Sequence, residues 1–186
     1  MIESEPGLEQ TQYLTFQLAG EEYAIGILQV KEIIPYVTLT AVPQTPASIR
    51  GVINLRGSVV PVIDLAVKLG LSPKPITARS CIVIVETKIA TGNLIMGVIA
   101  DSVSQVIDLS PQEISATPAF GTGVRIDFLH GIGRSGQKFV LVLDIDKVLA
   151  SDDAGAEPRA KSAVEAITEG KGLLKESNRN RESDCA

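Results

Sequence analysis

The chain has 186 residues, of which 45% are hydrophobic and only 4% aromatic, with no tryptophan. This length and composition suffice for a core of aliphatic side chains, and the prominence of Val and Ile favours strands over helices. The formal net charge of -5, without a cluster of Lys and Arg, argues against binding to the phosphate backbone of nucleic acids.

The cysteines and the first residues bear on the compartment. Cys81 lies in the apolar run 81–85 and Cys185 in a polar C-terminal segment, so we expect no disulfide between them, as is typical of a reducing compartment. The acidic start, residues 1–6, lacks the basic and apolar regions of a signal peptide, and no apolar run approaches the roughly 18 residues of a membrane helix. We therefore expect a cytoplasmic protein that does not insert into the membrane.

The first part of the chain predicts three short strands after a disordered lead at residues 1–11. Alternation of apolar and polar side chains over 13–18 predicts a strand with one buried face. After a turn, residues 22–25 form the second strand of a hairpin, and a third strand over 30–34 ends at a proline. The proline at the start of 46–49 is compatible with a short helical turn.

A second hairpin is predicted around Arg56-Gly57, with strands over 52–55 and 58–63. Asp64 is placed to cap a short helix over 65–69, which a glycine then stops.

The remaining strands are predicted near 81–87, 93–100, 103–108, 126–132 and 138–143. Asp144 again precedes a short helix, which reaches Ala150. From Ser151 onward hydrophobic periodicity fades and charge rises, so we expect residues 151–186 to be a polar tail, disordered or partly helical. The folded domain is therefore placed at 12–150.

The chain contains an internal repeat that indicates two similar units. The aligned stretches are 51–65 with 131–145, 26–28 with 97–99 and, after two extra residues in the second copy, 33–34 with 106–107. A repeat of this length fits two small β-barrels of about five short strands each, because closed barrels leave no exposed sheet edges.

Candidates for catalysis are few. His130 is the only histidine, so no pair of histidine metal ligands exists. Cys81 and His130 can be read as nucleophile and base, but a cysteine in an apolar strand is more typical of a small buried hydrophobe. Asp64 and Asp144 can be read as paired carboxylates for acid–base chemistry, whereas their equivalent places in the repeat favour helix caps. We expect no catalytic residue, no cofactor and no metal.

The stretch Asn54-Leu55-Arg56-Gly57, followed by Pro61-Val62-Ile63-Asp64-Leu65, resembles the CheW family, the coupling proteins of bacterial chemotaxis. Further stretches occur in the family's order within 12–150. They are 18–25, 30–34, 43–46, 49–57 and 97–103.

This resemblance implies an all-β fold of two SH3-like five-stranded β-barrels packed on one core, with short helices. It also implies a non-enzymatic adaptor in chemotaxis signal transduction. Such proteins join the cytoplasmic tip of a methyl-accepting chemoreceptor to the regulatory domain of the histidine kinase CheA.

The resemblance places Arg56, with Gly57, and Glu32, with Val30, on a receptor-binding surface. The residues themselves suit this role. A tight turn at Gly57 would direct the Arg56 guanidinium outward, and the period of a strand would place Val30, Glu32 and Ile34 on one face. An apolar strip edged by an acid and a base suits an amphipathic helix, and arginine is favoured at such contacts.

Arg56 also has a purely structural interpretation, in which it pairs with Glu32 or Asp64 and braces the turn. The two roles are compatible.

The second half of the chain is implied to contact the kinase. The candidates are Ile99, Asp101 and Val103, and the alternative is that they are ordinary strand residues of a barrel.

Two other functions remain open on the sequence. One is a CheW-like adaptor in a different kinase pathway, such as twitching motility. The other is a small-molecule sensor built on a β-barrel, which would need a pocket with convergent polar groups.

Overall fold

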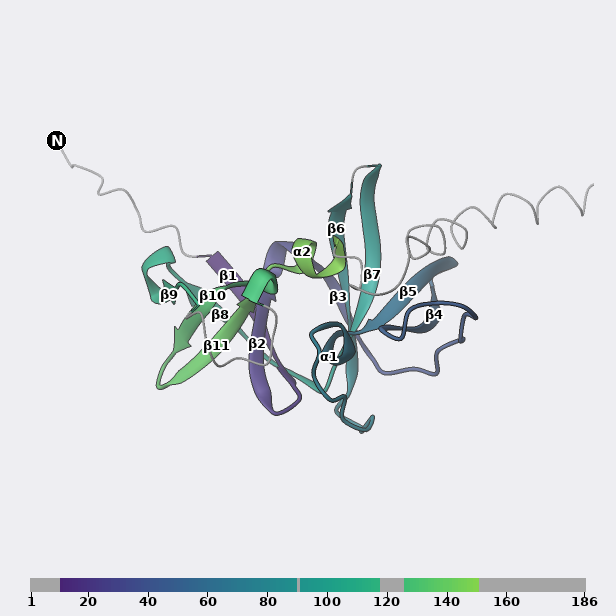
Figure 1. Ribbon diagram of the computed structural model, residues 1–186, viewed down its shortest axis with the longest axis horizontal. Coiled ribbons are helices and arrows are strands. Elements are labelled where there is room, and N and C mark those ends of the chain that lie inside the picture. Colours follow the sequence, from purple (N-terminus) through teal and green to yellow (C-terminus); the bar gives the residue numbers. More distant parts are fainter. Residues whose placement is uncertain (1–10, 90, 118–125, 151–186) are drawn as a thin grey trace, which may run out of the picture.

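The structure is a computed structural model that describes residues 11–89, 91–117 and 126–150 (Figure 1). The expected polar tail, and the expected lead apart from Thr11, lie outside the described residues. Thr11 begins the first strand rather than ending a disordered lead.

Strands dominate the described part of the chain. They are β1 (Thr11–Leu18), β2 (Glu21–Gly26), β3 (Val30–Pro35), β4 (Ile49–Leu55), β5 (Ser58–Asp64), β6 (Cys81–Ile89), β7 (Gly92–Ala100), β8 (Ser102–Leu109), β9 (Ile114–Ser115), β10 (Leu129–Ser135) and β11 (Lys138–Leu143). The helices are α1 (Leu65–Lys68) and α2 (Ile145–Ala150), and the short 3₁₀ turns are η1 (Ile27–Gln29), η2 (Pro111–Glu113) and η3 (Ile126–Phe128).

The strands form two sheets, which we call barrel A and barrel B. Barrel A has the strand order β8-β1-β2-β11-β10-β9 and barrel B the order β3-β6-β7-β5-β4. The chain begins in barrel A, forms all of barrel B and returns to complete barrel A, as the purple and green strands on the left of Figure 1 show. The expected all-β fold of two packed SH3-like barrels is confirmed, with the two-residue strand β9 added to barrel A.

The core has three layers, which explains the continuous apolar run in β6. Alternate side chains of a strand point to opposite faces of its sheet. On β6, Ile82 and Ile84 pack inside barrel B, whereas Val83 and Val85 join a central cluster between the barrels. A smaller cluster around Val140 fills barrel A.

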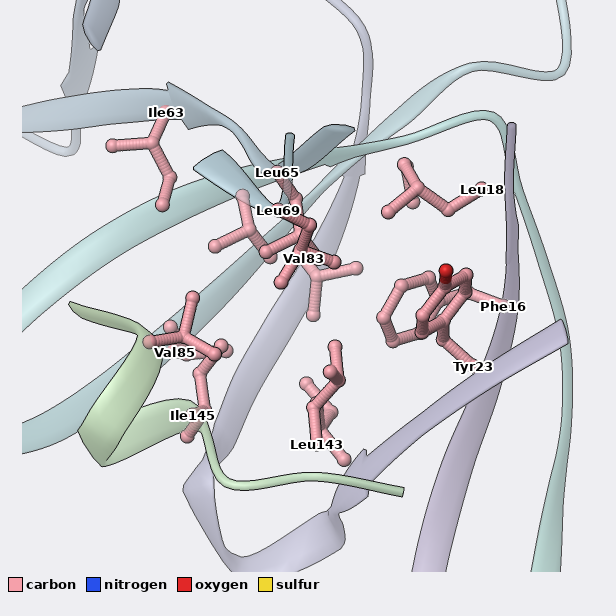
Figure 2. Packing of buried hydrophobic residues seen from close by; sticks show 14 of the residues in the cluster. Phe16, Leu18, Tyr23, Ile63, Leu65, Leu69, Val83, Val85, Leu143 and Ile145 are labelled. Atoms are coloured by element: carbon pink, nitrogen blue, oxygen red, sulfur yellow. The ribbon is translucent and has the colours of Figure 1, made fainter. Parts of the chain in front are cut away.

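The central cluster joins side chains from both barrels and both helices. Figure 2 labels Phe16, Leu18, Tyr23, Ile63, Leu65, Leu69, Val83, Val85, Leu143 and Ile145 among its members. The aromatic rings of Phe16 and Tyr23 stack with centroids 6.2 Å apart, and burial raises the pKa of Tyr23 to about 12. Because its members come from both barrels, the two barrels share one core.

The strand registers confirm the repeat. The β4–β5 pairing is irregular between Ile49 and Gly51, and the β10–β11 pairing is irregular at the aligned place, between Leu129 and Gly131. The match of residues 33–34 with 106–107 is also confirmed. Residues 33–34 pair with β6 of barrel B, and residues 106–107 pair with the corresponding positions of β1 in barrel A.

One alignment within the repeat is wrong. Val62 pairs in parallel with Gly97, and its aligned residue Val142 pairs in parallel with Ala24. Gly97 therefore corresponds to Ala24 and not to Gly26. A slip of two residues preserves the face on which each side chain lies, so hydrophobic alternation alone does not detect it.

The expected helix caps are present at both Asp64 and Asp144. Asp64 Oδ1 accepts hydrogen bonds from the backbone N–H groups of Ala66 at 3.1 Å and Val67 at 3.3 Å. Asp144 Oδ1 accepts one from the N–H of Lys147 at 3.2 Å. Each carboxylate thus satisfies backbone donors at the start of a helix.

Two local predictions are wrong. Residues 46–49 form a turn and no helix: the Ile49 N–H donates to the Pro46 carbonyl at 2.9 Å, and Ile49 begins β4. The strand predicted over 126–132 begins only at Leu129, because η3 precedes it. The buried ring of Phe128 holds η3 against the core, so tertiary packing overrides the strand propensity of this segment.

Replacing Gly51 with alanine is expected to destabilise the fold by about 3 kcal/mol, since it combines backbone strain with overpacking. Gly51 has φ +150°, and a Cβ there would lie 2.4 Å from the Thr40 carbonyl oxygen. Urea unfolding followed by circular dichroism measures the change. Gly26→Ala is the matched control, because a Cβ at Gly26 would meet only the Gln29 side chain at 3.6 Å. Equal stability of the two variants would contradict this account.

Candidate functional site

The Arg56-Gly57 turn projects from the end of barrel B. Leu55 pairs with Ser58, so Arg56 and Gly57 alone connect β4 to β5. Both have positive φ, 51° for Arg56 and 84° for Gly57, as the tight hairpin turn that matches strand twist requires. The Gly57 N–H donates to Asn54 Oδ1 at 2.8 Å, which fixes the turn. The arginine is thereby carried outward, as expected.

Arg56 forms an ion pair with Glu32 across the mouth of barrel B. The Arg56 Nη2–Glu32 Oε2 distance is 3.0 Å, and the two side chains are 81% and 26% exposed. β3 and β4 are the two edge strands of the barrel B sheet, so the pair links one edge to the hairpin at the other. An ion pair this exposed contributes at most about 1 kcal/mol to stability, and the guanidinium remains largely open to solvent.

The structural interpretation of Arg56 is confirmed for Glu32 and wrong for Asp64. The guanidinium that approaches Asp64 belongs to Arg50, whose Nε lies 3.6 Å from Asp64 Oδ2. Arg50 lies on β4 itself, whereas Arg56 lies in the turn beyond its end.

The predicted common face of Val30, Glu32 and Ile34 is wrong for Val30. The β3–β6 register shifts between Val30 and Glu32, and one extra residue in a strand reverses the faces that follow it. Val30 therefore packs against the central cluster, while Ile34 packs inside barrel B. The intervening Lys31 forms an ion pair with Glu86, and this hydrogen-bonded contact lowers the pKa of Glu86.

The three kinase-binding candidates differ in their surroundings. Ile99 is only 5% exposed and lies inside barrel B, so its side chain is not available to a partner. Val103 is partly buried against the central cluster. Asp101 accepts a hydrogen bond from the Ala19 N–H at 2.8 Å, which ties the β7–β8 connection to the β1–β2 turn. For Ile99 the structure therefore favours the alternative interpretation, in which it is an ordinary strand residue of a barrel.

Two strongly exposed apolar side chains are absent from the sequence-based candidates. Leu28 in η1 is 90% exposed, and Phe139 on β11 is 73% exposed. Phe139 aligns in the repeat with Val59, and the structure shows that Val59 is exposed as well, at 41%. Exposure itself is a tertiary property that a lone leucine or phenylalanine in the sequence does not reveal.

Cys81 and His130, the candidates for nucleophile and base, lie on strands of different barrels, β6 of barrel B and β10 of barrel A. Cys81 is buried, and burial raises the pKa of its thiol, which opposes formation of a nucleophilic thiolate. His130 is exposed on β10 and borders a shallow hollow of about 390 Å³ together with Tyr13 and Ile114. Within the described ranges, no group of three or more His, Cys, Asp or Glu is placed to hold a metal ion.

Comparison with known proteins gives consistent matches. The family described as the CheW-like domain matches residues 12–153. The chain is 34% identical over 142 residues to the chemotaxis protein CheW of Klebsiella aerogenes, which covers 76% of this chain and 83% of that protein. It is 35% identical over 144 residues to the Bacillus subtilis protein of the same name, covering 76% of this chain and 88% of that protein.

The fold also matches a solved structure. The scaffolding protein TtCheW from Thermoanaerobacter tengcongensis superposes with a TM-score of 0.70 at 30% identity, covering 82% of this chain and 94% of that one. Among the residues that the structure describes, no helix is long and apolar enough to cross a membrane.

Proposed function

Because this chain belongs to the CheW family of chemotaxis scaffolding proteins, we propose that it joins the cytoplasmic tip of a methyl-accepting chemoreceptor to the regulatory domain of the kinase CheA. In this role it acts in the cytoplasm, without catalysis of its own. It uses no cofactor and makes no contact with nucleic acid.

The exposed Glu32–Arg56 pair carries the receptor side of this proposal. The two residues present an acid and a base 3.0 Å apart at the mouth of barrel B, next to the partly buried apolar residues Ile34 and Leu55. An apolar strip with charged edges suits an amphipathic helix of the receptor. Arg56 and Gly57 contribute the turn, and Val30 contributes indirectly, by anchoring β3 to the central cluster.

We place the kinase contact on barrel A, because Glu32 and Arg56, the proposed receptor contacts, both belong to barrel B. Of the residues expected there, Asp101 and Val103 border the junction between the barrels, and Ile99 supports the interior of barrel B. Phe139 is the stronger candidate for direct contact, because aromatic side chains are frequent anchors of protein interfaces and its ring is 73% exposed.

The proposal is tested by measuring binding of the purified full chain to a receptor cytoplasmic fragment and to the CheA regulatory domain, separately and together. We expect binary binding to each and a ternary complex. Phe139→Ser is expected to lower kinase affinity about tenfold or more, as at an interface anchor, and to leave receptor affinity unchanged. Absence of binding to both partners would refute the proposal.

Two further arms separate the alternatives. Binding only to receptor and kinase fragments of a twitching-motility system would assign the chain to that pathway. A saturable small-molecule ligand that binds at the hollow beside His130, without any protein partner, would favour the sensor.

A further inference from the structure

Asp146, in the first turn of α2, bonds to elements outside its own helix. Its Oδ1 accepts hydrogen bonds from the Thr87 hydroxyl at 2.5 Å and from the Lys88 backbone N–H at 3.3 Å, both on β6 of barrel B. Its Oδ2 accepts one from the Gln29 side-chain amide at 3.0 Å. We call these three bonds the Asp146 clasp. It joins helix α2 to β6 of barrel B and to η1, which connects β2 of barrel A to β3 of barrel B.

The clasp is not a by-product of helix capping or of the repeat. The cap of α2 is a different residue, Asp144, which accepts from the Lys147 N–H. In the aligned helix α1 the place of Asp146 is taken by Ala66, which has no side chain for such bonds. The carboxylate of Asp146 therefore has a role that α1 lacks.

The clasp acts on the segment that leads into the receptor-binding strand. Gln29 is the last residue of η1 and directly precedes Val30, the first residue of β3. Within β3, Lys31 pairs with Glu86, which neighbours Thr87 on the same strand β6. The chain is thus held on both sides of Val30, at Gln29 by the clasp and at Lys31 by its ion pair, and Glu32 follows Lys31 directly. Figure 1 shows α2 between the barrels, beside β6.

We propose that Asp146 is a positioning residue for the receptor-binding surface, because its clasp fixes η1 and the start of β3 relative to both barrels. This inference rests on the proposed receptor-binding role of β3. Without the clasp, η1 would sample more conformations, and a smaller fraction of molecules would present Glu32 in the binding geometry. Apparent affinity falls by that fraction, although Asp146 itself need not touch the receptor.

The test uses the full chain and compares Asp146→Ala with Gln29→Ala. Asp146→Ala is expected to bind the receptor fragment about three- to tenfold more weakly, the effect of losing a typical hydrogen bond. Binding to the kinase regulatory domain should stay within about twofold, as expected of a site with no shared partners. Gln29→Ala removes only the bond to η1 and should give most of the receptor effect. Combining both substitutions should add little to Asp146→Ala, since they remove the same bond.

Two control variants separate positioning from general stability. Asp146→Asn keeps an acceptor oxygen for Thr87 and Lys88, and its amide N–H can donate to the Gln29 side-chain oxygen once the Gln29 amide flips, so this variant should keep most of the receptor affinity. Asp144→Ala removes the cap of α2 but not the clasp, and should lower stability without a specific loss of receptor binding. Unchanged receptor affinity in Asp146→Ala, or equal losses for receptor and kinase, would overturn the proposal.

Amide hydrogen exchange makes the test independent of the proposed function. Exchange at η1 and at the start of β3 should be faster in both Asp146→Ala and Gln29→Ala than in the unmodified chain. If the unmodified chain binds no receptor, the proposed function fails, and exchange alone then decides whether the clasp positions η1. Unchanged exchange in both variants would overturn the clasp.

Discussion

Replacing Arg56 with glutamate is expected to weaken receptor binding about 10- to 100-fold, as the loss of an arginine anchor at an interface does. Stability should change by less than about 1 kcal/mol, because the Arg56 side chain is 81% exposed and its pair with Glu32 lies in solvent. Titration calorimetry with a receptor cytoplasmic fragment gives the affinity, and urea unfolding gives the stability. Binding to the kinase domain should not change.

A charge swap distinguishes receptor contact from bracing of the turn. The double variant Glu32→Lys with Arg56→Glu restores an ion pair of reversed polarity across the mouth of barrel B. If the pair only braces the turn, the double variant should bind the receptor normally. If Glu32 and Arg56 contact the receptor, the double variant should bind it as weakly as the single variant does.

Arg134→Glu serves as the matched control, because Arg134 adjoins the aligned turn of barrel A, where its Nε donates to the Gly136 carbonyl. Normal receptor affinity in Arg56→Glu would refute the site.

The two barrels share a frame but present different chemistry at aligned places. In barrel B, Glu32 and Arg56 form an ion pair. In barrel A, the registers place Gln105 and Gly136 at the corresponding positions, and neither is charged. Barrel A offers instead the exposed ring of Phe139. A charged surface and an apolar side chain select different partners, which supports the proposal that the two barrels bind two unlike proteins.

Local patterns sufficed to predict most strands, both helix caps and the pair of barrels. Period-two alternation marks strands, and an aspartate before a short apolar run marks a helix start whatever the tertiary fold. The capped helices at Asp64 and Asp144 therefore agree with the sequence within a residue at their starts.

The failures share a physical cause, which is that they depend on contacts between distant segments. The shared face of Val30 and Ile34 fails because the strand is irregular at Lys31, and alternation assumes a continuous pleat. Asp146 looks in sequence like an acid that favours the positive end of a helix. Only the tertiary structure brings Thr87 and Gln29 to its carboxylate.

Replacing Phe16 with alanine is expected to destabilise the protein by about 3–5 kcal/mol, the largest effect on stability that we predict. Phe16 on β1 is fully buried in the central cluster and stacks on Tyr23. The cluster joins barrel A to barrel B (Figure 2), so the cavity would weaken the packing of one barrel on the other. With a total stability of about 5–15 kcal/mol typical of native proteins, such a loss should lower binding to both partners together, unlike Arg56→Glu. Urea unfolding measures the change.

Phe139→Ala is the matched control, because it removes the same ring from a position 73% exposed and should change stability by less than about 1 kcal/mol. Similar stabilities for the two variants would contradict a core shared by the barrels.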